Sequence, residues 1–412
     1  MGAAVIEKHI TSDRGMEGND HKVSLLPDEF AQMMQGIRRV EESMGQGGER
    51  SISQGEMMNR EVLAKSLVAA CDVPAGTEIT EAMVRIQSPG QGLQPNRLND
   101  LIGRRLPVAK AQGEVFFPSD LETPAATPRH YRFKQPFGLP VRYHDIKVFS
   151  QVSNLDLVEI HLSYKDLEVD LDQVLPNRQG IGLVVHAPEL FAGDHTLDLC
   201  TEDSSYRDHS IAELQRVIDI SRDLRTRFQC PDPVLLVTNV GGFSEHHHLS
   251  RSEREPLRER LIASLQQLNT AGEVEIIPQT MPPFPWHFGG QRFHNLFVDS
   301  DFIHQFCEEQ GMRVCLDVSH SKLACNHLHI PFRQFLDQIL PFTAHLHLAD
   351  AKDVDGEGLQ INDGDIDWVQ LFEQIHHHCP KASFIPEIWQ GHKNGGEGAW
   401  LALERLEAAA GA

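Results

Sequence analysis

Three stretches decide the fold: CLDVSH at 315–320, HLHLAD at 345–350 and IPEI at 385–388. Each is a short apolar run that ends in polar residues. Buried parallel strands have this pattern, and their carboxyl ends carry the functional side chains. The runs recur every 30 to 40 residues, which leaves room for a helix between successive strands. This part of the chain therefore predicts repeated βα units.

Residues 130–412 contain eight such strand candidates with amphipathic helices between them. The candidates lie near 141–146, 157–162, 181–187, 233–240, 273–279, 313–319, 343–349 and 383–389. Eight strands in 283 residues predict an α/β fold, a (β/α)8 TIM barrel. An open doubly wound sheet is the alternative, but no GxGxxG motif follows a strand. We therefore expect a closed barrel.

The polar residues at the strand ends include metal-ligand types. Asp317, His347 and Glu387 come from three consecutive strands, so we expect them to converge on one divalent cation. Single histidines are commoner as packed or solvated residues, and we interpret His144, His161 and His345 in that way. The tracts at 246–248 and 376–378 are interpreted as solvated histidines.

The first 129 residues divide into three further segments. Residues 1–58 contain a helix that begins near Pro27 and a Gly, Ser and Gln-rich linker. Residues 59–122 form a small β-rich domain with strands at 66–70 and 83–86, and residues 123–129 are a proline-stiffened linker before the barrel.

The composition excludes several classes of protein. Apolar residues make up 40% of the 412 residues, and the formal net charge is −22, of which −18 falls on residues 130–412. Such a charge argues against binding to a nucleic-acid backbone. There is no transmembrane-length apolar run or signal-peptide pattern, and the odd number of seven cysteines includes no CxxC pair. We expect a cytoplasmic protein.

The barrel carries motifs that are similar to those of the xylose isomerase-like family, which includes sugar isomerases, sugar epimerases and endonuclease IV-type enzymes. The motifs are HAPEL at 186–190, QTMPPFPWHFGG at 279–290, CLDVSH at 315–320, HLADA at 347–351 and PEIWQGH at 386–392. The resemblance implies a divalent cation, Mn, Mg, Co or Zn, held by Asp317, His347, Glu387 and Gln279. His320 resembles the family's substrate-contacting or second-metal histidine.

Two positions depart from the family pattern. Gln279 stands where the family usually has a metal-ligating Glu, and Asn239 stands where the three-zinc nucleases have a His. An amide can coordinate a metal, but it cannot accept a proton. Proton transfer between two carboxylates is therefore in question, and we predict Glu387 as the base with His186 or His320 as the acid.

The same resemblance suggests which residues contact a sugar. We predict Trp286, Trp389 and His392 as substrate-binding residues, with Phe288 beside them; plain packing is the alternative for the aromatic residues. The expected ligand is a small sugar or sugar phosphate.

The N-terminal third is similar to a second family. SLVAACDVPAGTEIT, SPGQG at 88–92 and IGRRLPVAKAQGEVF resemble the SAF or antifreeze-like (β-clip) domain of sialic acid synthases. VIEKHITSDRGMEGNDHKVSLLPDEF resembles the end of the synthase barrel, where His9 matches a metal-binding His. Ser88 replaces the usual sugar-contacting Arg, and only about one strand of that barrel is present.

These observations predict a carbohydrate-biosynthesis protein of the sialic (nonulosonic) acid type, whose intact catalytic unit is a metal-dependent isomerase or epimerase barrel. Two alternatives are a fragment of an N-acetylneuraminate synthase fusion that needs a separate synthase barrel, and a sugar-binding barrel without turnover. A homodimer is compatible with either.

Overall fold

The computed structural model describes residues 3–44, 54–121, 126–175, 179–228, 230, 232–284 and 292–411. It divides into two compact units, residues 1–52 and 53–412. Most of the predicted linkers, together with Trp286 and Phe288, lie outside the described residues. Residues 54 and 55, the end of the linker that we predicted at 45–55, belong instead to helix α2 (Gln54–Leu63).

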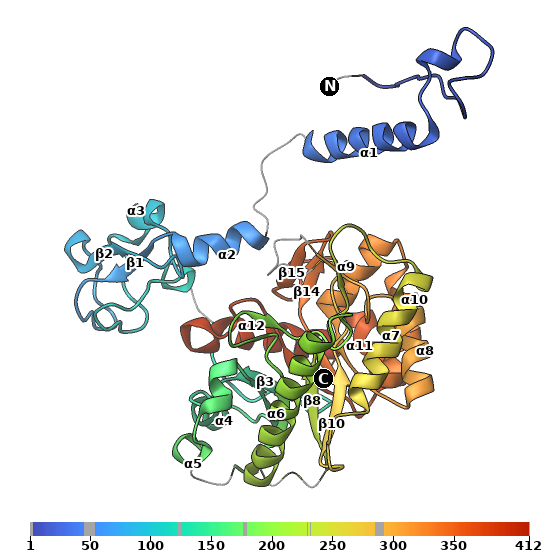
Figure 1. The fold of residues 1–412 in the computed structure, drawn as a ribbon. Coiled ribbons are helices and arrows are strands. Elements are labelled where there is room, and N and C mark those ends of the chain that lie inside the picture. The colour runs from blue at the N-terminus through green and yellow to red at the C-terminus, as the bar shows by residue number, and fades with distance from the viewer. Residues whose placement is uncertain are drawn as a thin grey trace. The chain divides into compact units, whose positions relative to one another are not determined.

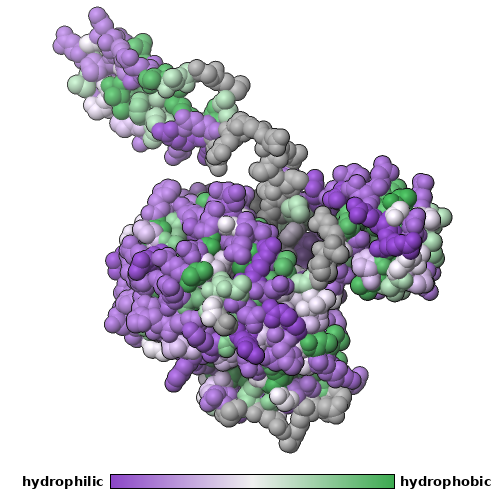
Figure 2. Space-filling view, turned by 180° about the vertical axis from the view of Figure 1, so that it is seen from behind, coloured by the Kyte–Doolittle hydropathy of each residue, from purple (hydrophilic) through white to green (hydrophobic). Residues whose placement is uncertain are grey.

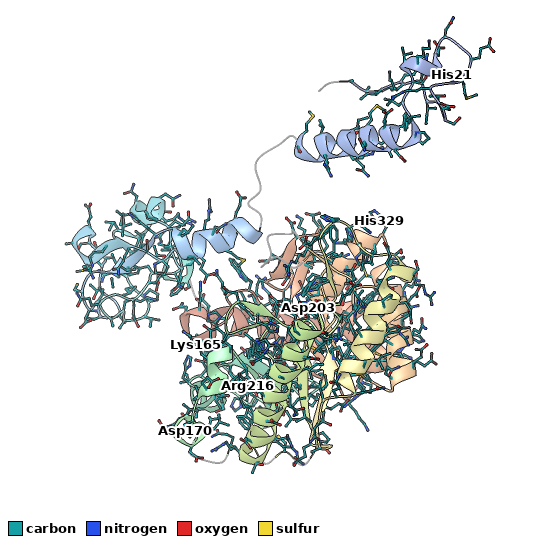
Figure 3. All side chains as sticks on the ribbon, viewed as in Figure 1. His21, Lys165, Asp170, Asp203, Arg216 and His329 are labelled. Atoms are coloured by element: carbon teal, nitrogen blue, oxygen red, sulfur yellow. The ribbon has the colours of Figure 1, made fainter. Side chains whose placement is uncertain are left out.

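The N-terminal unit contains a short helix, η1 (His21–Val23), and one long helix, α1 (Pro27–Met44). Nδ1 of His21 lies 2.7 Å from Thr11 Oγ1, which ties two parts of the loop together (Figure 3). None of the described apolar side chains of this unit is buried, and Val5 is 85% exposed. Figure 2 shows hydrophobic residues on the surface of this unit. The unit therefore has no apolar core of its own among the described residues.

The small β domain is built on the antiparallel pair β1 (Ser66–Ala69) and β2 (Val84–Gln87). Short helical turns connect the rest: η2 (Glu81–Met83), η3 (Pro95–Arg97), α3 (Leu98–Leu101) and η4 (Pro118–Asp120). Its core includes Leu67, Ile79 and Phe116. The core also encloses an ion pair, since Lys110 Nζ lies 3.2 Å from a carboxylate oxygen of Asp120 and the two side chains are 7% and 4% exposed.

Eight parallel strands form the barrel. They are β3 (Gly138–Val141), β4 (Leu157–His161), β5 (Gly182–His186), β8 (Val234–Thr238), β10 (Val274–Pro278), β12 (Val314–Asp317), β13 (Thr343–Leu348) and β16 (Ser383–Pro386). Strands β3, β4, β5, β8 and β10 pair in this order, as do β12, β13 and β16. Parallel bridges join Gln279 to Cys315 and Phe384 to Phe137, so the two sheets close into a ring. The predicted (β/α)8 barrel is confirmed.

Helices surround the strands, as α6, α7, α8 and α11 show in Figure 1. They are α4 (Ile146–Val152), α5 (Leu171–Val174), η5 (Tyr164–Glu168), α6 (Ser204–Phe228), α7 (Arg251–Leu265), α8 (Ser300–Gln310), α9 (Val318–Leu328), α10 (Phe332–Ile339), η7 (Leu340–Phe342), α11 (Trp368–His378) and α12 (Lys393–Ala410). Their apolar faces pack on the sheet in one large core that includes Leu214 and Phe306. On α6, Arg216 lies at the surface and pairs with Glu213 and Glu168 (Figure 3).

Short antiparallel pairs extend the loops of the barrel. They are β6 (Leu190–Phe191) with β7 (His195–Thr196), β9 (Phe243–Ser244) with β11 (Phe293–His294), and β14 (Asp350–Lys352) with β15 (Gly356–Leu359). No helix in the described ranges has the length and apolar character needed to cross a bilayer.

One strand differs from our prediction. The first barrel strand occupies 138–141 rather than 141–146, because Pro140 lies inside it and residues 142–145 form a turn into α4. His144 and Asp145 therefore lie beyond the strand, and the His144 side chain is 81% exposed. The interpretation of His144 as a non-ligand agrees with this position.

Candidate metal centre

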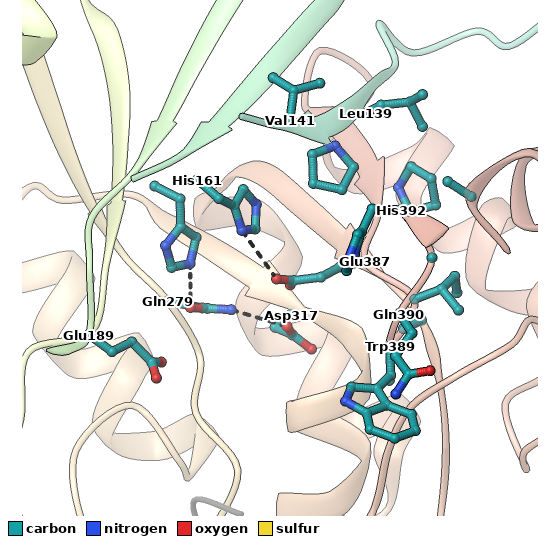
Figure 4. A pocket seen from close by; sticks show the side chains of 18 of the residues that line it. Leu139, Val141, His161, Glu189, Gln279, Asp317, Glu387, Trp389, Gln390 and His392 are labelled. Carbon is teal, nitrogen blue, oxygen red and sulfur yellow. Dashed lines mark hydrogen bonds and ion pairs between the residues drawn. The ribbon is translucent and has the colours of Figure 1, made fainter. Parts of the chain in front are cut away.

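Four predicted ligands lie at the carboxyl end of consecutive barrel strands. Gln279 follows β10, Asp317 ends β12, His347 lies in β13 and Glu387 follows β16. Because the strands are parallel and in register, with Asp317 opposite His347 in the ladder, these side chains lie near one another. Figure 4 shows Asp317, Gln279 and Glu387 around one cavity.

Three of these side chains form a group that could hold a metal ion. Asp317, His347 and Glu387 each bring one ligand atom to within 4.8 Å of the others. Nδ1 of His347 lies 2.6 Å from Glu387 Oε2 and 3.7 Å from Asp317 Oδ2. The backbone N–H of His320 holds the other Asp317 oxygen at 2.8 Å. Two carboxylates and an imidazole are a donor set that fits a divalent cation.

Gln279 lies against this group. Its Nε2 is 3.1 Å from Asp317 Oδ2 and 3.2 Å from His347 Nδ1, and its Oε1 is 3.3 Å from His186 Nε2. His186 Nδ1 faces the Ala187 carbonyl at 2.8 Å, and a carbonyl only accepts, so the proton of a neutral ring is on Nδ1. Nε2 of His186 is then an acceptor. Turning the amide so that its nitrogen donates to His186 points its oxygen at Asp317 and His347, where it could coordinate a cation.

Protonation in this cluster follows from burial and neighbouring charge. Burial lowers the pKa of His186, with the nearby His161 acting in the same direction. Burial would raise the pKa of Glu387, but His347 outweighs it and holds that pKa well below its usual range. Glu387 is therefore a carboxylate, and it faces His161 across 3.9 Å (Figure 4).

Glu159 on β4 was not singled out from the sequence. Its side chain is fully buried, and three imidazoles surround it, His161 Nε2 at 2.9 Å, His345 Nε2 at 2.7 Å and His347 Nε2 at 3.0 Å. Burial would raise the pKa of Glu159, but His347 and the other two histidines lower it well below its usual range. The sequence signal was an acidic residue inside an apolar strand, two positions before His161.

His320 at the start of α9 has both ring nitrogens facing acceptors. Nδ1 is 3.0 Å from the Thr280 carbonyl, and Nε2 is 3.0 Å from Glu357 Oε1. Burial would lower the pKa of His320, but Asp317 and Glu357 raise it to about 10. His320 is therefore an imidazolium beside the ligand group. Glu357, which sequence reasoning also missed, reaches it from the β14–β15 hairpin.

The base of that hairpin is fixed by one carboxylate. Asp350 is fully buried. It accepts hydrogen bonds from the backbone N–H groups of Ala351, Asn362 and Ile366, at 2.9 to 3.2 Å, and from Trp368 Nε1 at 2.9 Å. A carboxylate with several donors holds the chain segments that carry them together. Glu357 therefore extends over the cavity from a rigid base.

A cavity of about 950 Å³ opens beside the ligand group. Among the predicted residues it is lined by His186, Gln279, Asp317, His320, Glu387, Trp389 and His392. Figure 4 shows His392 next to Glu387 and Trp389 further along the wall. This volume is at the upper end of the range for small-molecule sites. Trp286, the remaining predicted substrate residue, lies outside the described part of the chain.

Comparison with known proteins shows the family of the barrel. The profile of the xylose isomerase-like TIM barrel family matches residues 152–408, more than half of the chain. The chain belongs to the xylose isomerase-like TIM barrel family. Two other profiles match the N-terminal third, the NeuB family at residues 1–49 and the SAF domain at 64–122. The predicted fusion of synthase-type and xylose isomerase-like segments is confirmed.

The curated relatives match a limited part of this xylose isomerase-like chain. N,N'-diacetyllegionaminic acid synthase of Legionella pneumophila is 32% identical over 122 residues, which is 30% of this chain and 34% of the synthase. N-acetylneuraminate-9-phosphate synthase of Mus musculus is 34% identical over 125 residues, also 30% and 34%. The chain thus spans about a third of the length of these relatives.

Among solved structures, a D-tagatose 3-epimerase-like protein superposes with a TM-score of 0.50. The match covers 66% of this chain and 96% of that one, at 16% sequence identity. At this identity the similarity concerns the fold of the xylose isomerase-like barrel alone.

Proposed function

We propose that the barrel is a divalent-metal-dependent sugar isomerase or epimerase, in the biosynthesis of sialic (nonulosonic) acid-type sugars. The observation that carries the proposal is the convergence of Asp317, His347 and Glu387 beside a cavity of small-molecule size. The synthase-type segments in the same chain support the biosynthetic context. The seven free cysteines support a cytoplasmic location.

In this proposal Asp317, His347, Glu387 and the turned amide of Gln279 hold the cation. A bound divalent cation would polarise sugar oxygens and favour loss of a proton from the neighbouring carbon. We assign Glu387 to accept this proton, because its carboxylate lines the cavity beside the other residues of the ligand group.

We assign His186 as the second residue that transfers a proton. Its Nδ1 is committed to the Ala187 carbonyl, so its Nε2 is the nitrogen that can take up and return a proton, in exchange for the hydrogen bond from the turned Gln279 amide. Nε2 lies beside Gln279, where the family's second carboxylate would stand. His320 has no nitrogen left for this task, and we assign it the role of a fixed positive charge next to Asp317.

The charge of the cavity favours an uncharged sugar over a sugar phosphate. Its described lining includes five carboxylates, those of Asp145, Glu189, Asp317, Glu357 and Glu387. The single arginine of that lining, Arg142, already pairs with Asp166 at 3.0 Å and with the His161 carbonyl. The other cationic group of the described lining, the His320 imidazolium, has both ring nitrogens engaged by the Thr280 carbonyl and Glu357, so a phosphate dianion would find its main cationic partner in the metal itself.

Solvent exchange tests the reaction. The full chain is incubated in deuterated water with Mn, Mg, Co or Zn and a panel of neutral ketoses, aldoses and N-acetylated amino sugars, with their phosphates in parallel. We expect deuterium to enter a carbon next to the carbonyl of a neutral sugar, and Glu387→Gln to lose at least about 100-fold in rate. Tight metal and sugar binding without exchange would contradict the enzyme proposal and favour a binding barrel.

A second candidate function concerns the N-terminal unit. Its exposed Val5, Ile6 and Ile10, and the absence of an apolar core among its described residues, favour completion by a separate synthase barrel. Co-expression with a synthase barrel, followed by an assay of phosphoenolpyruvate consumption, tests it. The idea requires more activity in the pair than in the separate barrel.

A further inference from the structure

We infer that Glu159 is the positioning residue of the metal centre: it fixes the ring proton of His347 on Nε2, so that Nδ1 faces the cation held by Asp317 and Glu387. The inference rests on the metal centre of the proposed function. It assigns a role to a residue that lies beneath the centre and does not contact the substrate.

The two nitrogens of His347 face two different carboxylates, of which Glu387 belongs to the ligand group and Glu159 does not. Nε2 lies 3.0 and 3.1 Å from the two oxygens of Glu159, while Nδ1 lies 2.6 Å from Glu387 Oε2. A carboxylate only accepts hydrogen bonds, so Glu159 and Glu387 each favour a proton on the nitrogen that they face. A cation held by Asp317 and Glu387 would take the place of the proton on Nδ1 alone, because Glu159 faces the other nitrogen and keeps the proton on Nε2.

Glu159 is too deep to act on a substrate. Its side chain is fully buried, and Glu159 is not among the residues that line the cavity. Glu159, His345 and His347 also satisfy the distance criterion for a metal group. We assign that group a positioning role instead, because His345 turns its Nδ1 to Ser383 Oγ at 2.6 Å, and none of its members lines the cavity as Asp317 and Glu387 of the other group do.

Outer-shell carboxylates of this kind have a known energetic effect. A carboxylate that accepts from the distal N–H of a ligating imidazole fixes the tautomer, orients the ring and raises the basicity of the ligand. Removing such a partner lowers metal affinity by about 10- to 100-fold. Glu159 is placed for this role, since it faces Nε2 of His347 and lies 2.9 Å from His161 Nε2 and 2.7 Å from His345 Nε2.

Metal affinity is the direct test. The full chain and two variants are titrated with Mn²⁺ by isothermal calorimetry, after circular dichroism shows that they fold. Glu159→Gln keeps the shape but removes the charge, and we expect it to bind Mn²⁺ about 10- to 100-fold more weakly. Ser383→Ala is the matched control, because it disturbs the far end of the same buried network through His345 and should leave the affinity unchanged.

Two results separate this inference from the proposed function. Equal affinities for Glu159→Gln and the unsubstituted chain, or equal losses in both variants, would overturn the role of Glu159 and leave the metal centre standing. Failure of the unsubstituted chain to bind Mn²⁺, Mg²⁺, Co²⁺ or Zn²⁺ would overturn both.

A measurement on the unsubstituted chain keeps the test decisive if Glu159→Gln does not fold. With ¹⁵N-labelled histidine and ¹¹³Cd²⁺ in the site, the ring nitrogen bonded to the metal shows cadmium coupling, and His347→Gln identifies the signal. We expect the coupling on Nδ1 and a proton on Nε2. Coupling on Nε2 would overturn the inference.

Discussion

Two groups of buried charge lie in different parts of this chain, and their surroundings differ. In the SAF domain, Lys110 and Asp120 pair with each other, and Asp120 also accepts the backbone N–H of Phe117 at 2.7 Å. In the barrel, Glu159 and His347 are at least as deeply buried, but the network continues through Glu387 to a cavity. A closed pair of charges has no open side at which a ligand could bind, whereas a charge network that opens onto a cavity can bind a ligand. The comparison predicts that a substitution can disrupt the Lys110–Asp120 pair without affecting the barrel network, and that the reverse also holds.

The largest effect should come from the closed pair. Lys110→Met leaves the Asp120 carboxylate buried without its cation, which costs about 3–5 kcal/mol. Hydrogen exchange of peptides within 64–121 should accelerate, while Mn²⁺ affinity stays unchanged. Arg97→Met is the control, because its partner Asp100 is exposed and such a pair contributes about 0–1 kcal/mol. Equal exchange in both variants would contradict the assignment.

The second largest effect is expected in the barrel network that opens onto the cavity. Asp317→Asn removes a ligand charge but keeps a good N-cap for α9, so the fold should persist. We expect Mn²⁺ affinity to fall by about 100-fold or more, beyond the loss of an outer-shell partner. Calorimetry measures the affinity, and unfolding in urea should be shifted little. A strongly destabilised variant with intact metal binding would reverse our distinction between the two groups.

A smaller gain is expected at Gln279. Gln279→Glu supplies the carboxylate that is usual in the family, so it should raise Mn²⁺ affinity by about tenfold. It should also increase solvent deuterium exchange, because a second proton acceptor then flanks the sugar. Gln279→Met, which has a similar length and no amide, is the control. A Glu variant no better than the Met variant would show that position 279 does not face the cation.

The smallest effect is a difference in thiol reactivity between the SAF domain and the barrel. Cys71 of the SAF domain is exposed, whereas Cys315 beneath the metal centre is buried, and burial raises the pKa of Cys315 to about 12. Iodoacetamide at pH 8 should therefore label Cys71, leave Cys315 as an unreacted thiol and not alter Mn²⁺ binding. Mass spectrometry locates the label. Early modification of Cys315 would mean that the barrel opens more readily than its packing indicates.

Much of this arrangement could be predicted from the sequence. Parallel strands end on one side of a barrel, so the polar residues after three apolar runs had to meet, and Asp317, His347 and Glu387 do. The first strand lies at 138–141, three residues before the position that we predicted, and it includes Pro140, a residue that is uncommon inside strands.

Other parts of the site depend on contacts that a linear pattern does not encode. Glu159 is a single acid in an apolar strand, and its partner His347 lies 188 positions later. Glu357 meets His320 only because a hairpin turns back over the cavity. Gln279 was recognised by its family position, but the orientation of its amide depends on His186 and the Ala187 carbonyl.

The root of the β14–β15 hairpin has a consequence for how such a site can diversify. Asp350 accepts hydrogen bonds from the chain on both sides of the hairpin. Substitutions at residues 353–355, the exposed tip, should therefore not disturb the strand that carries His347. Variation at the tip would alter what Glu357 and its neighbours present to a sugar and leave the cation-binding residues intact. The fold thus separates a part that evolution can vary from a part that it must keep.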